Sequence, residues 1–300
     1  MELRGARILV TGPTSQVAQA VVRALAPASR VFGLGRLAKP EERRALLALG
    51  VEPVVADLAE ELPALPEVDF VLHFAVLKSG DFARDLRANA EGSGQLLSRC
   101  RGARAFLHVS SAAVYQYPGH GRAREDSPLG DNHRVLMPTY SLAKIAAEST
   151  VRFAARELGV PVTIARLSVP YGDAGGWPWY HLMMMKAGVP IPVHREQPNV
   201  YNPLHEDDYV AQLPKLLALA SVPATTLNWG GSEPASIEDW TAWLGELTGL
   251  EAKLEPTERA FGSLELDLTL MHEKLGRTAV GWRDGIRRMV AKRNPELLKR

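Results

Sequence analysis

A tyrosine and a lysine four residues apart, Tyr140 and Lys144, have the types and spacing of an acid–base pair. On a helix this spacing places both side chains on one face. An ammonium group beside a phenol stabilises the phenolate, so we expect the pKa of Tyr140 to lie below its ordinary value of about 10. Such a phenol exchanges a proton while an alcohol and a carbonyl compound interconvert. The same spacing also occurs by chance on exposed helices, so the interpretation depends on the surrounding motifs.

A turn of small residues follows the first apolar segment, Arg7–Thr11. Small residues in such a turn let the backbone approach the pyrophosphate of a dinucleotide at the start of the next helix. Gly12 is followed by Ser15 and Ala18 in a G-x-x-G-x-x-G spacing, but only the first is glycine. An ordinary strand–turn–helix is therefore the alternative. The residues expected to bind the dinucleotide here are Gly12, Thr14, Ser15, Gln16 and Val17.

The second apolar segment ends at Gly35-Arg36. An acidic residue at this place binds the ribose hydroxyls of NAD, whereas a guanidinium suits the additional 2′-phosphate of NADP. Lys39 supplies a second cation nearby. Arg36 therefore predicts NADP, with NAD as the alternative cofactor. A surface arginine without a ligand is the other interpretation.

The elements that must position these residues alternate between short apolar segments and helical patterns. The predicted strands are Arg7–Thr11, Arg30–Leu34, Glu52–Ala56, Phe70–Phe74, Ala105–Ser110 and Val162–Leu167. The predicted helices are Val17–Leu25, Glu41–Leu49, Asp81–Cys100 and Tyr140–Leu158. Near-continuous apolar strands separated by helices predict an α/β fold with a parallel sheet covered on both faces.

The pattern changes beyond about residue 170. Trp177-Pro178-Trp179 and further prolines predict irregular structure, although Met183–Met185 is consistent with a pocket wall or a buried helix. Helices follow at Asp207–Ala220, kinked at Pro214, and at Ile237–Leu247. We expect a dinucleotide-binding domain at 1–170 and a small C-terminal α/β substrate lobe at 171–300. A strand and a helix around 203–230 are expected to return to the core.

Composition limits the classes of partner and site. Lys and Arg number 35 and Asp and Glu 34, so the net charge of +1 gives no reason to expect nucleic acid or a membrane as a partner. The single cysteine, Cys100, excludes an intramolecular disulfide and a cysteine-based zinc site. No apolar run reaches the ~18–20 residues that span a bilayer, and the chain opens almost directly on an apolar strand. We therefore expect a cytoplasmic protein.

A cluster of polar residues, His205-Glu206-Asp207-Asp208, has the residue types of a metal site. Asp207 or Asp208 is more simply interpreted as the cap of the helix that follows. No metal is therefore expected.

The motifs and their order resemble those of the extended (atypical) short-chain dehydrogenase/reductase family, which includes NAD-dependent nucleotide-sugar epimerases and dehydratases. The resemblance runs nearly end to end. It is carried by Asp57-Leu58, His73-Phe74-Ala75-Val76, Asn89 with Gly92, Ser110–Tyr115, Ala165–Gly172, Pro203–Asp208, Leu227–Gly231 and Leu275-Gly276.

This resemblance implies a Rossmann-type doubly wound sheet with catalytic residues Ser111, Tyr140 and Lys144. It also implies a homodimer formed through the helices at Asn89–Cys100 and Tyr140–Leu158. The further cofactor contacts that it implies are Asp57, Leu58, Phe74, Ala75, Val76, Tyr140, Lys144 and Val169.

Several positions depart from the family pattern. Tyr201-Asn202 stands where nucleotide-sugar members usually carry Arg-Asp, which removes one expected diphosphate contact, although Arg259 is similar to the family's other diphosphate arginine. Ala112-Ala113 stands where sugar dehydratases carry Asp-Glu, so we do not expect dehydration. The expected substrate contacts are Ser111, Trp177, Trp179 and Arg259.

Three functions follow from these observations. We expect an NADP(H)-dependent oxidoreductase that interconverts a carbonyl and an alcohol on a small, partly apolar molecule through a Ser-Tyr-Lys proton relay. Arg36, the Tyr201 replacement and the aromatic segment after Gly175 favour it. The alternative is a nucleotide-sugar epimerase with tightly bound NAD, which Arg259 favours. A second alternative is a non-catalytic dinucleotide-binding sensor, against which the intact catalytic set argues.

Overall fold

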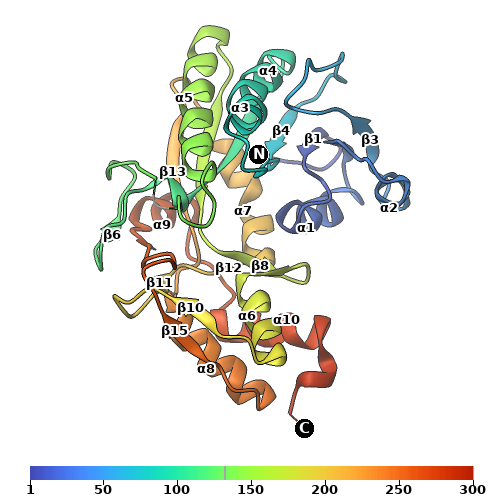
Figure 1. Ribbon diagram of the computed structural model, residues 1–300. Helices are drawn as coiled ribbons and strands as arrows, with labels where there is room; N and C mark the ends of the chain where they lie inside the picture. Colours follow the sequence, from blue (N-terminus) through green and yellow to red (C-terminus); the bar gives the residue numbers. More distant parts are fainter. Residues whose placement is uncertain (132, 300) are drawn as a thin grey trace.

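Seven parallel strands form the central sheet, in the spatial order β13-β7-β5-β4-β1-β2-β3 (Figure 1). The computed structural model describes residues 1–131 and 133–299. The strands are β1 Arg7–Thr11, β2 Arg30–Gly35, β3 Glu52–Val55, β4 Phe70–His73, β5 Ala105–Ser111, β7 Val162–Leu167 and β13 Thr225–Trp229. From β1 the chain runs outward to β3 on one side and then restarts at β4 on the other. This is the predicted doubly wound topology, whose crevice lies at the carboxyl ends of β1 and β4.

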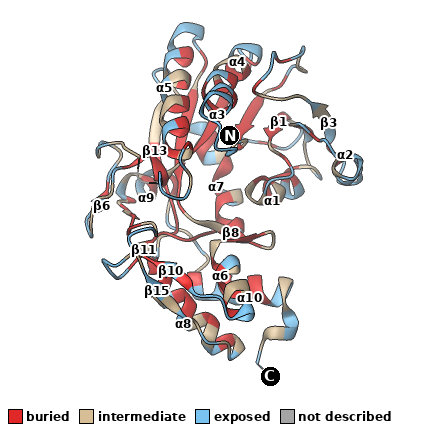
Figure 2. Ribbon diagram, viewed as in Figure 1, coloured by how far each residue is buried: buried red, intermediate tan, exposed pale blue. Residues whose placement is uncertain are grey.

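Helices cover both faces of this sheet. Successive strand residues point to opposite faces, so Leu9 packs toward α4 (Gly92–Arg99) and α5 (Tyr140–Leu158). Ile8 and Val10 pack with α1 (Gln16–Leu25) and α7 (Glu206–Ala218) on the other face. Figure 2 shows buried residues concentrated on the strands and on the helix faces turned toward them. The remaining helices of the first half are α2 Pro40–Ala48 and α3 Phe82–Leu86.

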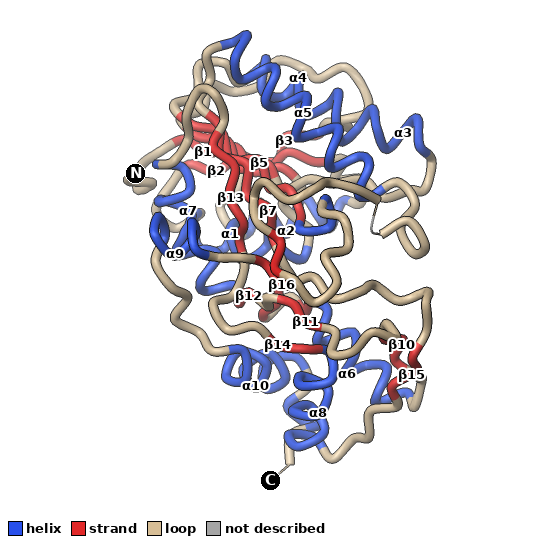
Figure 3. Tube along the Cα trace, turned by 90° about the vertical axis from the view of Figure 1, so that its left-hand side faces the viewer, coloured by secondary structure: helices blue, strands red, loops and turns tan. Residues whose placement is uncertain are grey.

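A smaller lobe lies beyond the carboxyl ends of the strands (Figures 1 and 3). Helices α6, α8 and α10 pack on one another in this lobe. The helices of the second half are α6 Trp177–Ala187, α8 Ile237–Thr248, α9 Thr269–Leu275 and α10 Trp282–Arg293. In the described part of the chain, no helix combines the length and apolar character needed to cross a membrane.

Short strand pairs connect the lobe to the core. The strands are β6 Arg122–Ala123, β8 Pro170–Gly172, β9 Gly175–Gly176, β10 Ile191–Val193, β11 Val200–Tyr201, β12 Leu204–His205, β14 Ala235–Ser236, β15 Leu254–Pro256 and β16 Glu265–Leu266. They form the sheets β12-β8-β9, β10-β15, β11-β14 and β16-β6. The β6–β16 pair joins a loop of the first half to the C-terminal part of the chain. Conversely, β13 and α7 from the second half belong to the central layers.

Three local predictions need correction. Trp177–Ala187 is a helix, because Pro178 lies in its first turn, where the missing N–H has no helical partner to lose. The single helix predicted over Asp81–Cys100 is divided into α3, a π-helical turn at Arg87–Glu91 and α4. Helix α7 is capped by the His205 imidazole, which accepts from the Asp207 N–H at 3.2 Å, and not by an aspartate.

Candidate active site

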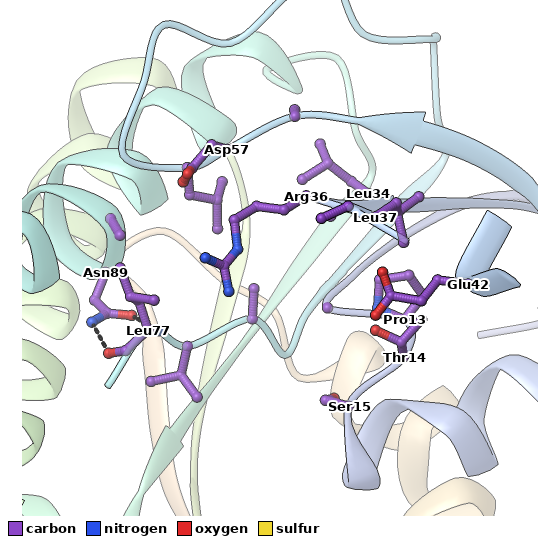
Figure 4. A pocket seen from close by; sticks show the side chains of 18 of the residues that line it. Pro13, Thr14, Ser15, Leu34, Arg36, Leu37, Glu42, Asp57, Leu77 and Asn89 are labelled. Carbon is purple, nitrogen blue, oxygen red and sulfur yellow. Dashed lines mark hydrogen bonds between the residues drawn. The ribbon is translucent and has the colours of Figure 1, made fainter. Parts of the chain in front are cut away.

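A cavity of about 460 Å³ lies at the carboxyl ends of the strands around β1 and β4 (Figure 4). Gly12, in the turn after β1, has a φ of 63° and crosses closely over the loop after β4. A Cβ at Gly12 would lie 3.0 Å from the Cα of Ala75, so glycine is required there. Ser15 caps α1 by accepting from the Ala18 N–H at 3.3 Å. The start of α1 thus borders the cavity, as the pyrophosphate of a dinucleotide requires.

Most of the cofactor residues predicted from the sequence line this cavity. They are Gly12, Thr14, Ser15, Arg36, Asp57, Leu58, Ala75 and Val76. Four others do not. The Gln16 amide donates to the Pro170 carbonyl at 3.1 Å and so points to the lobe. Val17 and Phe74 pack in the core, and the Val169 carbonyl accepts from the Leu204 N–H at 3.0 Å.

Arg36 extends from the end of β2 into the cavity (Figure 4). It forms no ion pair with the residues that the structure describes, whereas Asp57 on the facing wall is paired with Arg84 at 2.8 Å. Glu42 also lines the cavity, but its carboxylate accepts from the Lys39 N–H at 3.2 Å and caps α2. The guanidinium is therefore free to meet an anionic group.

The predicted catalytic residues converge at the end of β5. Ser111 is the last residue of β5 and Tyr140 the first of α5. The Ser111 hydroxyl lies near enough to the Tyr140 phenol to affect its pKa, and the Lys144 ammonium donates to the Val109 carbonyl at 2.8 Å. Residues separated by about 30 positions in sequence thus meet at one strand end, beside the crevice where a dinucleotide binds in this topology.

The electrostatics of Tyr140 differ from the expectation. Burial raises the pKa of its phenol, and the Ser111 hydroxyl opposes that rise. The predicted lowering by Lys144 does not dominate, because desolvation penalises the phenolate more. Burial also lowers the pKa of Lys144 to about 8, with Lys78 adding to the decrease and Glu148 opposing it.

A buried ion pair fastens α5 to the sheet behind Lys144. Glu148, fully buried, accepts from Arg166 of β7 at 2.8 Å, from Ser110 at 2.6 Å and from Arg152 at 3.0 Å. The Arg166 guanidinium also donates to the Tyr115 hydroxyl at 2.9 Å. Helix α5 is therefore fixed to β5 and β7 by these bonds.

The sequence interpretation missed several residues around Tyr140. The Lys78 ammonium lies 5.4 Å from the centroid of the Tyr140 ring. The His133 ring lies 6.1 Å from that ring and 4.1 Å from the ring of Phe261 in the lobe. Asp85 joins the loop after Lys78 to Thr139. Asp85 precedes Asn89 by four residues, or one helical turn. Because residues at this spacing lie on the same helix face, the position of Asn89 could have indicated that Asp85 also faces the loop after β4.

The predicted substrate contacts divide into two groups. Trp177 lies in an aromatic cluster with Tyr201, Trp240 and Phe261, and Phe261 connects the cluster to His133 beside Tyr140. Trp179 instead packs under Arg293, 4.0 Å away, and its indole donates to Asn294 at 3.1 Å. It contacts the C-terminal segment because residues two positions apart on a helix point to nearly opposite sides of it.

Tyr201 and Arg259, at the two positions where the resemblance leads us to expect diphosphate-binding arginines, differ in exposure. The Tyr201 hydroxyl donates to the Gly262 carbonyl at 2.7 Å and is buried, so it stabilises the lobe. Arg259 is exposed and forms no ion pair within the described residues. Of these two positions, only Arg259 presents a cation.

Comparisons with known proteins show the family and the fold of the chain. The family model described as "NAD dependent epimerase/dehydratase family" matches residues 8–212. Among curated proteins no match was found. The chain is 22% identical to the solved UDP-glucose 4-epimerase from Thermotoga maritima with UDP-glucose, at a TM-score of 0.81 over 97% of this chain and 99% of that chain.

Two further solved structures are similar. UDP-glucuronic acid 4-epimerase from Bacillus cereus, with UDP-glucuronic acid and NAD, is 21% identical at a TM-score of 0.79, over 95% of this chain and 98% of that chain. DesIV, a dTDP-glucose 4,6-dehydratase from Streptomyces venezuelae with NAD bound, is 24% identical at a TM-score of 0.78, over 98% of this chain and 99% of that chain. At these identities the likeness establishes the fold, and the chemistry must be argued from the site.

Proposed function

Because the chain belongs to the NAD-dependent epimerase/dehydratase family, we propose that it interconverts an alcohol and a carbonyl carbon of a small molecule with a nicotinamide dinucleotide. The observation that carries this proposal is the convergence of Ser111, Tyr140 and Lys144 at the end of β5. A bound nicotinamide supplies or accepts the hydride. The remaining chemistry is a proton transfer at the Tyr140 hydroxyl oxygen.

Each residue has a separate task in this scheme. The Ser111 hydroxyl donates a hydrogen bond to the substrate oxygen and orients it toward Tyr140. Tyr140 gives its proton to that oxygen as the carbonyl becomes an alcohol, and takes it back in the reverse direction. Its raised pKa keeps the phenol protonated at neutral pH, which suits donation. Lys144 would bind the ribose hydroxyls of the dinucleotide and so hold the nicotinamide in position.

For the net reaction we propose the epimerisation of a nucleotide sugar, in which one carbon is oxidised and then reduced. The similar structures support it, since they include epimerases with UDP-sugars. Exposed Arg259 is available for a diphosphate. Dehydration is disfavoured because Ala112 and Ala113, directly after Ser111, supply no acid or base.

A second candidate is an NADP(H)-dependent reductase or dehydrogenase acting on a small, partly apolar substrate. Two observations favour it. Arg36 lines the cavity as an unpaired cation among the described residues, which suits a 2′-phosphate. Buried Tyr201, packed against Trp177, stands where the resemblance leads us to expect a diphosphate-binding arginine.

One experiment separates these candidates. The purified protein is incubated with UDP-glucose or UDP-galactose and a catalytic amount of NAD, and the sugars are analysed by NMR. Epimer formation without accumulation of NADH supports the first candidate. Oxidation of NADPH in proportion to an added ketone or aldehyde supports the second.

Tyr140→Phe abolishes either turnover while NAD(P) binding by calorimetry stays within about twofold, because the phenol transfers the proton without holding the dinucleotide. Full turnover by Tyr140→Phe rules out the mechanism.

A further inference from the structure

Asp85, in α3, is a buried carboxylate (0% exposed) that the proposed mechanism does not use. Its Oδ2 accepts from the N–H groups of Ser79 and Gly80 at 2.9 and 3.0 Å and from the Thr139 hydroxyl at 2.7 Å. Its Oδ1 accepts from the Ser79 hydroxyl at 2.6 Å and from the Ser79 N–H at 3.0 Å. No ion pair reaches Asp85 from the described residues. Hydrogen bonds therefore compensate the buried charge, and although burial raises its pKa, they keep that pKa below the ordinary value.

The donors to Asp85 flank the catalytic tyrosine. Ser79 directly follows Lys78, whose ammonium lies 5.4 Å from the centroid of the Tyr140 ring. Thr139 directly precedes Tyr140 at the start of α5. The Thr139 hydroxyl makes no capping bond to α5, so its bond to Asp85 joins the first turn of that helix to the loop after β4.

The same loop is held at its other end. The Asn89 side chain, on the π-helical turn, accepts from the Leu77 N–H and donates to the Leu77 carbonyl, both at 2.8 Å. Lys78 therefore lies between two fixed residues, Leu77 and Ser79. Burial is the main cause of the lowered pKa of Lys144 and of His133, and the charge of Lys78 adds to the lowering of both.

We propose that Asp85 is a positioning residue of the active site, which holds Lys78 against the Tyr140 ring and fixes the backbone from which Tyr140 projects. The inference rests on the proposed role of Tyr140. An ammonium against an aromatic ring is attracted by its π-electrons, so Lys78 restrains the ring plane while Thr139 restrains the helix start. A misplacement of about 1 Å at such a site costs up to about 100-fold in rate.

The test uses the full-length protein and four substitutions. Asp85→Asn keeps the shape but replaces one acceptor oxygen by an NH₂ group that faces donors. Thr139→Val removes the hydroxyl, while Thr139→Ser keeps it. Asp69→Asn is the matched control, since Asp69 is a partly buried aspartate that pairs with Arg7 at the opposite, amino ends of the strands.

The readouts require no substrate. Lysine labelled with ¹³C at Cε, assigned with Lys144→Met, reports the titration of Lys144, and tyrosine labelled at Cζ, assigned with Tyr140→Phe, reports the Tyr140 ring. Release of Lys78 removes a like charge from Lys144, so we expect its titration midpoint to rise by about 0.5–1 pH unit in Asp85→Asn and Thr139→Val. The Tyr140 signal moves in the same variants. Thr139→Ser and Asp69→Asn leave both unchanged.

The inference is overturned if Asp85→Asn leaves the Lys144 midpoint and the Tyr140 signal at their wild-type values. It is also overturned if Asp85→Asn shifts all 7 tyrosine signals alike, because that indicates a general loss of structure. Rates with UDP-glucose give a separate comparison. The wild-type protein could be inactive on every substrate while its variants still show the selective shifts of the Lys144 midpoint and the Tyr140 signal. That result contradicts the proposed function and leaves the positioning role of Asp85 intact.

Discussion

At the scale of single residues, the site is governed by competition between burial and local charge. Tyr140 and Lys144 are both desolvated, and desolvation favours the neutral form of each, so the pKa of the phenol rises and that of the amine falls. The pair predicted from its spacing is present. The electrostatic consequence expected from that spacing is reversed by the environment.

The proposed role of Lys144 predicts that dinucleotide binding depends on pH. Its pKa in the free protein is about 8, so the ammonium loses its proton as pH rises through that value. Because the charged form donates to ribose hydroxyls, we expect the Kd for the dinucleotide to increase above pH 8 by up to about tenfold per pH unit. Fluorescence titration between pH 6.5 and 9.5 measures it. Lys144→Met should show weak binding without this dependence, and an equal slope in both proteins contradicts the assignment.

Arg36 determines the preference between dinucleotides in our proposal. Arg36→Ala removes a cation that lines the cavity and forms no ion pair with the described residues. We therefore expect NADPH to bind about 10- to 100-fold more weakly, as the loss of hydrogen bonds to a charged group implies. NADH binding changes little. Calorimetry with both dinucleotides measures the difference, and Arg44→Ala, exposed on α2 outside the cavity, is the control. Equal weakening of both dinucleotides would remove the NADP preference.

At the scale of elements, the site is built where strand ends meet helix starts. The turn after β1, the loop after β4, the end of β5 and the first turn of α5 all lie at the carboxyl edge of the sheet. Their relative positions depend on bonds between elements, and the Glu148–Arg166 pair is the buried ionic bond between α5 and β7. Burying two charges costs desolvation free energy. Removing one partner is therefore more destabilising than replacing both partners with apolar residues.

We therefore expect Glu148→Ala to destabilise the protein by about 3–5 kcal/mol, because it leaves the Arg166 charge buried and unpaired. Hydrogen bonds lower the pKa of Glu148 below its ordinary 4.5, so this stabilisation is present above pH 4.5 and is lost as pH falls through the folded-state value. Urea unfolding at pH 7 and pH 4 measures both effects. The double variant Glu148→Leu/Arg166→Met should lose less than Glu148→Ala alone. A larger loss in the double variant would contradict an unpaired charge as the cause.

At the scale of the whole molecule, the chain crosses repeatedly between its layers. β13 closes the sheet beside β7 although it lies in the second half, and α7 covers β5 and β7. The lobe is thus tied to the core by β12, α7 and the β6–β16 pair. From the lobe side, Phe261 contacts His133, whose ring lies beside Tyr140.

The outer face of the α3–α5 layer carries exposed apolar side chains. Phe153 is 59% exposed and Leu142 40% on α5, and Phe82 is 49% exposed on α3. The sequence resemblance implies pairing through the helices at Asn89–Cys100 and Tyr140–Leu158, and we propose that two copies pair there, with Phe82 of α3 at the side. Phe153→Glu places a charge in the interface, so we expect a dimer to become a monomer in sedimentation velocity. Leu47→Glu, at a 60% exposed position on α2, should leave the dimer intact. A wild-type monomer would refute the proposal.

The sequence by itself determined the strands of the sheet, because apolar segments are a local property of the chain, and the resemblance of its motifs implied the doubly wound order that the sheet has. The roles of Ser111, Tyr140 and Lys144 stay a prediction. Tyr140–Leu158 was predicted at its observed bounds. Only the tertiary structure decided which side chains face the cavity, since Gln16 and Phe74 lie beside lining residues yet point elsewhere. It also decided the sign of the Tyr140 pKa shift and brought Lys78, Asp85 and His133 to the site. Desolvation and contacts between distant segments depend on how the layers pack, and no spacing along one segment encodes them.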